Sequence, residues 1–224
     1  MSHPANRRTT AGLLGLSLVA GAVALAPIGA TNAASSKALN GTFRLTKGSY
    51  SNGKAHGTYF RMSNSGGLFR NPDSSASNKT YTLGTPGTDG GLATGRFQPH
   101  PDPPFDSKGN AKANKILRPQ SFTSIRFSVA TIKKQKGSSA TASVTKASVR
   151  DGKLTVSLPG FTAEWNKQYF NQGAPKPDGS GRAATGSYSS KTKRFAFEWR
   201  SKVVGGPFNG FTGFWHFEGK FRAR

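Results

Sequence analysis

The sequence of 224 residues contains no cysteine, so disulfide bonds do not contribute to the stability of the fold. It also lacks a phosphate-binding Gly-Lys-Thr/Ser motif and a Gly-x-Ser-x-Gly nucleophile motif. No apolar run after residue 33 is long enough to span a membrane. These absences leave a mature chain that depends on its hydrophobic core and carries no recognised catalytic or cofactor signature.

The first 33 residues have the features of a secretory signal peptide. Arg7 and Arg8 form a positively charged start, residues 11–28 form an uncharged apolar run, and residues 31–33 are a small-residue cleavage site. An uncleaved membrane anchor is the alternative, but the alanine- and glycine-rich run favours cleavage near Ala33. We therefore expect a secreted or cell-wall-associated protein, with a short linker at residues 34–39.

Acidic residues are scarce. Nine Asp and Glu stand against 32 Lys and Arg, and the formal net charge is +23. Removing residues 1–33 would remove two arginines and no acid, which leaves +21 on the mature chain. A charge of this size attracts polyanions and accelerates encounters with them.

The C-terminal residues alternate between apolar and polar with a period of two, which is typical of half-buried β-strands. In residues 194–204 and 211–222, most aromatic residues occupy one face, and the other face carries the charged residues together with Phe214 and His216. Gly205, Gly206 and Pro207 lie between the two runs and favour a turn. We therefore predict an aromatic hairpin at the centre of the domain.

Other segments predict further strands and one helix. Asp151-Gly152 is a strong two-residue hairpin signal, and residues 40–63 predict a hairpin that turns at Asn52-Gly53. Residues 161–170 predict a short helix, because aromatic residues recur at every fourth position. Residues 63–115 are rich in glycine and proline and predict a long irregular region.

The pattern as a whole predicts one all-β domain over residues 40–224. We expect an antiparallel sandwich or a partly closed barrel, with the first hairpin close to the last strand. The helix at 161–170 and the long region at 63–115 are the expected exceptions to regular strands.

The positive residues suggest what such a domain would bind. Most of them alternate with apolar residues in the predicted strands and so face solvent, and a lysine-rich loop adds three more. The predicted polyanion-binding residues are Arg44, Arg61, Arg126, Lys133, Lys134, Lys136, Arg194, Arg200, Lys202, Lys220 and Arg222. We expect a non-enzymatic protein that binds anionic polymers of the cell envelope or extracellular space, such as teichoic-acid-like polyphosphate, acidic glycan or nucleic acid.

Two other functions remain open. A small hydrolase or lyase acting on an acidic carbohydrate would use His100, Asp102, Asp106 or His216 as acid–base groups. A barrel could instead carry an apolar ligand between its aromatic faces. The spacing of His, Asp and Glu predicts no metal site, and no cofactor is expected.

Three stretches resemble a group of exported actinobacterial proteins of unknown function. They are YTLGTPGTDGGLATGRFQPHPDPPFDSKGN, NQGAPKPDGS and VGGPFNGFTGFWHFEG, which begin at Tyr81, Asn171 and Val204. The resemblance covers about a third of the mature chain. It implies secretion and an all-β domain, and it supplies no catalytic residue.

Overall fold

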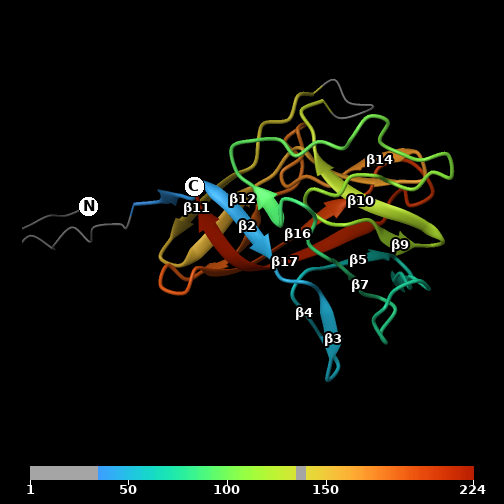
Figure 1. The fold of residues 1–224 in the computed structure, drawn as a ribbon, viewed down its shortest axis with the longest axis horizontal. Helices are drawn as coiled ribbons and strands as arrows, with labels where there is room; N and C mark the ends of the chain where they lie inside the picture. The colour runs from blue at the N-terminus through green and yellow to red at the C-terminus, as the bar shows by residue number, and fades with distance from the viewer. Residues whose placement is uncertain (1–34, 135–139) are drawn as a thin grey trace, which may run out of the picture. The chain divides into compact units, whose positions relative to one another are not determined.

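The computed structural model describes residues 35–134 and 140–224 (Figure 1). These residues belong to one compact unit, Ala34–Arg224. They form antiparallel strands and no helix, which confirms the predicted all-β class. Among the residues described, no helix has the length and apolar character needed to cross a membrane. The predicted signal peptide and Lys136 lie outside the described residues.

The long strand β17 (Thr212–Ala223) is the centre of the larger sheet. It pairs along one edge with β16 (Arg194–Lys202), and Trp199 lies opposite Trp215. The alternate side chains of β17 are buried on one face and lie nearer solvent on the other. The aromatic hairpin predicted from the alternation is therefore confirmed.

Two strands from the start of the domain share the other edge of β17. Strand β2 (Gly41–Leu45) pairs with residues 219–223, and β5 (Tyr59–Asn64) pairs with residues 212–216. The predicted proximity of the first and last strands is confirmed. The predicted 40–63 hairpin is only partly right, because β2 and β5 pair with β17 and a smaller hairpin of β3 (Ser49–Ser51) and β4 (Lys54–His56) projects between them.

The larger sheet has eleven strands and curls into a half-barrel, as the bend of β17 in Figure 1 shows. The strand β1 (Lys37–Ala38) lies within the predicted linker and pairs with β11 (Lys146–Arg150), on the hairpin that turns at Asp151-Gly152 as predicted. The remaining strands of this sheet are β6 (Gly67–Leu68), β7 (Thr82–Leu83), β8 (Gly91–Ala93), β12 (Lys153–Ser157) and β15 (Ala184–Tyr188).

A second sheet of four strands packs against the larger one. Its order is β14-β13-β10-β9, and it comprises β9 (Gln120–Phe122), β10 (Ile125–Thr131), β13 (Phe161–Trp165) and β14 (Gln168–Asn171). Phe127 and Phe161 of this sheet contact Trp215 of β17 at ring-centroid distances of 6.4 and 5.0 Å. The core therefore lies between the two sheets.

Two tryptophans in this core carry polar groups that need partners. The indole N–H of Trp199 donates to the backbone carbonyl of Gln172 at 2.8 Å. The indole N–H of Trp215 donates to the side-chain oxygen of Gln172 at 3.2 Å. A Cβ at Gly213 would collide with the same side chain. Gly213 on the aromatic face therefore makes room for a buried glutamine that satisfies both indoles.

The predicted helix at residues 161–170 is wrong, because this segment is the β13–β14 hairpin. Asn166 and Lys167 form its two-residue turn with φ of 48° and 58°, as such turns require. A spacing of four residues fits a strand as well as a helix, because four is a multiple of the strand period of two. Phe161 and Trp165 accordingly lie on the core side of one strand.

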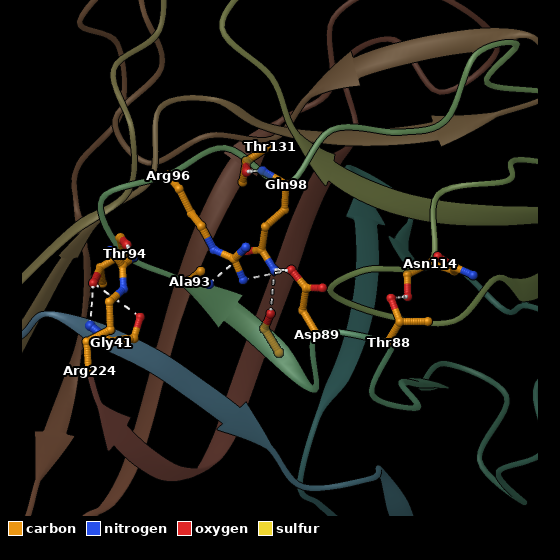
Figure 2. Close-up of polar contacts among 11 residues, drawn as sticks. Gly41, Thr88, Asp89, Ala93, Thr94, Arg96, Gln98, Asn114, Thr131 and Arg224 are labelled. Carbon is orange, nitrogen blue, oxygen red and sulfur yellow. Dashed lines mark hydrogen bonds and ion pairs between the residues drawn. The ribbon is translucent and has the colours of Figure 1, made fainter.

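The glycine- and proline-rich region is mostly irregular, as predicted, and a buried glutamine helps to fix it. Figure 2 shows the side chain of Gln98 directed toward Asp89 and Ala93. Its amide donates to Asp89 Oδ2 at 2.9 Å and to the Gly91 carbonyl at 2.8 Å, and its oxygen accepts the Ala93 N–H at 2.8 Å. The backbone of Gln98 also bonds to Thr131 of the smaller sheet. Since its polar groups satisfy one another, this cluster is structural.

Candidate functional site

The candidate site is the outer face of the larger sheet, where the strands β5, β17 and β16 lie side by side. The register places Phe214 of β17 between Arg61 of β5 and Arg200 of β16. All three residues alternate with buried neighbours and therefore point away from the core. One aromatic ring is thus flanked by two guanidinium groups from separate strands.

Aromatic rings support both of these guanidinium groups. The Cζ of Arg200 lies 4.8 Å from the centre of the Phe214 ring, and that of Arg61 lies 4.3 Å from the centre of the Tyr81 ring. Such stacking restricts a long side chain while leaving its N–H edge available. The Nε of Arg61 is buried and has no hydrogen-bond partner among the described residues.

An open basin of about 710 Å³ lies over this row. Arg182, from the segment just before β15, joins Arg61 and Arg200 at its edge. We call these three residues the first cation cluster. Sequence reasoning missed Arg182, because it precedes a strand in a glycine-rich segment and has no place in an alternating pattern.

His216 and Glu198 occupy the next row along the sheet. The His216 ring stacks on Tyr59 with a centroid distance of 4.7 Å, and its Nδ1 lies 3.8 Å from Glu198 Oε2. Burial lowers the pKa of His216 below 6.5, while Glu198 and Glu218 act in the opposite direction. Burial also raises the pKa of Tyr59. The row is therefore a neutral aromatic pair beside an exposed carboxylate near neutral pH.

A second group of cations lies further along the same face. Lys220 of β17 is flanked in register by Arg44 of β2 and Arg194 of β16, and Arg222 follows two positions later. We call these four residues the second cation cluster. Within the described part of the chain, Arg194 is the one member of either cluster with an ion pair, at 3.6 Å from Glu218.

The structure does not gather all of the predicted polyanion-binding residues. Lys202 follows Arg200 on the outer face and extends the first cluster. Arg126 lies instead on β10 of the smaller sheet, 4.0 Å from Asp106, and Lys133 and Lys134 follow that strand. The predicted set therefore divides between the two sheets, apart from Lys136, which lies outside the described residues.

The four predicted acid–base residues do not form one site, because His100, Asp102 and Asp106 lie in the glycine- and proline-rich region and His216 lies on β17. His216 lines the basin, whereas Asp106 holds a turn by accepting hydrogen bonds from the backbone and side chain of Asn110. His100 contacts Glu164, which is fully buried on β13. Burial raises the pKa of Glu164, and the contact with His100 opposes this rise.

The space between the sheets bears on the apolar-ligand hypothesis. A cavity lined by Phe60, Phe127 and Trp215 measures about 40 Å³, far below the roughly 300 Å³ that small-molecule sites usually provide. In the described ranges, no group of three or more His, Asp or Glu residues is placed to hold a metal ion. Of these two spaces, the basin on the outer face is the larger and has room for a ligand.

Comparisons with protein-family models, with curated proteins and with solved structures give no match. The outer face of the larger sheet is therefore the feature of this molecule that bears on function. Its geometry combines positive charge, supported guanidinium groups and an open basin.

Proposed function

We propose that this protein is a secreted, non-enzymatic binding protein for anionic polymers of the cell envelope or extracellular space. The observation that carries the proposal is the first cation cluster, in which Arg61 and Arg200 flank Phe214 and Arg182 borders the same basin. Among described residues, none of the three has a carboxylate within ion-pair distance. Their charges are therefore available to a ligand.

The chemistry of these groups favours carboxylate or phosphate ligands. A guanidinium presents N–H donors in a planar fork that matches both anions. Stacking on Phe214 and Tyr81 reduces the side-chain entropy that binding would otherwise cost. The open form of the basin suits a polymer that passes over the surface rather than a small molecule that is enclosed.

The proposal includes export, which rests on the signal-like residues 1–33 and on the resemblance described above. A binding role is preferred to catalysis because only His216, of the four acid–base candidates, lines the basin. A protein outside the cell would meet polyanions in the cell wall and in its surroundings, where the net charge of +21 on the mature chain promotes encounter.

The test is binding of the mature protein to purified cell wall, with and without its anionic polymers, across a salt series. We expect binding to fall steeply with salt and to disappear when the polymers are stripped. In the double variant Arg182→Gln and Arg200→Gln, the slope of log affinity against log salt should fall by about two, one unit for each cation removed.

The control variant is Arg118→Gln with Lys146→Gln, which removes the same charge from exposed positions outside both clusters. If affinity depends only on net charge, the two double variants will weaken binding equally. Equal weakening by the two double variants would contradict the proposed site. Binding that depends neither on salt concentration nor on the anionic polymers would contradict it as well.

A further inference from the structure

The two cation clusters are separated along the outer face by acidic residues. Phe214, at the centre of the first cluster, and Lys220, at the centre of the second, are six positions apart on β17. At about 3.3 Å per residue, this spacing is roughly 20 Å along the strand. Glu198 and Glu218 lie between them on the same face. Along the outer face, a group of positive charges is therefore followed by negative charges and then by a second group of positive charges.

The two acids differ in their surroundings. Glu218 accepts the Gly57 N–H at 3.2 Å and pairs with Arg194, and its side chain is 29% exposed. It holds the sheet together where β2 and β5 meet β17. Glu198 is 73% exposed, and the imidazole of His216, which is neutral near neutral pH, is the one titratable group within ion-pair distance of it among the described residues. Since Glu198 makes no comparable structural contact, its charge faces whatever binds to the sheet.

We propose that the outer face selects linear polymers of the glycan type in which neutral units separate the anionic groups, and that Glu198 rejects polymers with uninterrupted charge. This inference rests on the proposed function and adds the class of ligand. A polymer with sparse anions can place one group in each cluster and a neutral unit over Glu198. A polymer with an anion on every unit must place one beside this carboxylate.

The physical basis is repulsion built into an otherwise attractive surface. Specificity often depends on an element that disfavours the wrong ligand as well as on contacts with the right one. Glu198 lies two positions from Arg200 and four from Arg194 on β16, between attractive charges. A ligand long enough to reach both clusters also gains affinity, because its second contact is intramolecular.

The test compares two polymers at equal carboxylate concentration and low salt. Hyaluronan carries one carboxylate on every second sugar, and polygalacturonate carries one on every sugar. Wild-type protein should prefer hyaluronan. Glu198→Gln should strengthen binding of polygalacturonate by about threefold to tenfold, as expected for relief of one close like-charge contact, and that of hyaluronan by less than about twofold.

Asp151→Asn is the matched control, because it removes one exposed negative charge in the β11–β12 turn and keeps a residue that tolerates positive φ. It should leave the ratio of the two affinities unchanged. If Asp151→Asn and Glu198→Gln raise both affinities equally, the effect belongs to net charge and the inference is overturned.

A second arm tests the span between the clusters with hyaluronan fragments of increasing length. Affinity per carboxylate should rise once a fragment covers roughly 20 Å, the distance set by six strand residues. The variant Lys220→Gln with Arg222→Gln should remove this rise. An affinity that does not depend on length would contradict the inference.

The outcomes separate this inference from the proposed function. Equal affinity for both polymers, or tighter binding of a single-stranded oligonucleotide than of hyaluronan, rejects the selection of sparse charge and leaves polyanion binding in place. If no polymer binds in a salt-dependent manner, the proposed function and this inference both fail.

Discussion

The imidazole Nδ1 of His100 contacts the carboxylate of Glu164, although 64 positions separate the two residues in the chain. Glu164 lies on β13 and is fully buried, whereas the side chain of His100 is 23% exposed and comes from the glycine- and proline-rich region. A buried carboxylate next to an imidazole from a covering segment links that segment to the smaller sheet. The second carboxylate oxygen of Glu164 has no hydrogen-bond partner in the described part of the chain.

Loss of the imidazole should therefore be costly. His100→Ala leaves a buried carboxylate without its partner, and we expect the free energy of unfolding to fall by about 2–4 kcal/mol, because an uncompensated buried charge is expensive. Denaturant unfolding at neutral pH measures the loss. His56→Ala is the matched control, since His56 is exposed and should change stability by less than about 0.5 kcal/mol.

The same pair predicts a coupling between two substitutions. In the Glu164→Gln background the buried charge is gone, so His100→Ala should cost about 1–3 kcal/mol less than in the wild type. A double-mutant cycle measures this difference. If the two losses add without coupling, the contact contributes nothing to stability.

Gln98 offers a prediction about the order of the irregular region. Gln98→Leu would leave the Ala93 N–H and the Gly91 carbonyl without their partners in a buried site, so we expect a loss of about 2–4 kcal/mol. Hydrogen exchange should accelerate first around β8. Gln120→Leu serves as the comparison, because the Gln120 amide makes one exposed bond to the Arg118 carbonyl and its loss should be nearly neutral.

The lowered pKa of His216 predicts a pH dependence of stability. A group whose pKa is lower in the folded state stabilises the fold above its unfolded pKa of 6.5 and loses that contribution as the pH falls through the folded value. The wild type should therefore lose stability on acidification below pH 6.5. His216→Gln should reduce this loss in thermal unfolding scans. An unchanged pH profile would contradict the assignment.

The hairpin turn at Asn166 and Lys167 can be tested directly. Lys167 has φ of 58°, a conformation that costs a residue with a side chain more than it costs glycine. Lys167→Gly should raise the free energy of unfolding by about 0.5–1 kcal/mol. If residues 166–167 were helical, Lys167→Gly would instead lower the free energy of unfolding. The control is Lys153→Gly in the strand β12, which should also lower it.

The sequence predicted the parts of the fold that local rules determine. The alternation of β16 and β17 and the turn at Asp151-Gly152 follow from side-chain period and backbone conformation alone. The pairing of β2 and β5 with the same edge of β17 follows from register between distant strands, which composition does not encode. The helix prediction failed because aromatic residues at every fourth position fit the periodicity of a strand as well as that of a helix.

The candidate site shows the same division. The outward position of Arg61, Arg200 and Lys220 follows from alternation and was predicted. Their division into two clusters depends on which strands are neighbours, and so does the placement of Glu198 between them. Arg182 and the burial of Glu164 depend on how irregular segments pack, for which one sequence carries no periodic signal.

The sharing of β17 by β16, β2 and β5 has a consequence for how the protein is made. Phe43 lies opposite Phe221, so β17, which joins the early and late parts of the domain, is synthesised after every other described strand. Such distant pairings make folding slow, because the chain must close a large loop before it gains contact energy. The larger sheet is incomplete until β17 has been synthesised, which would keep the chain unfolded for the export that we propose.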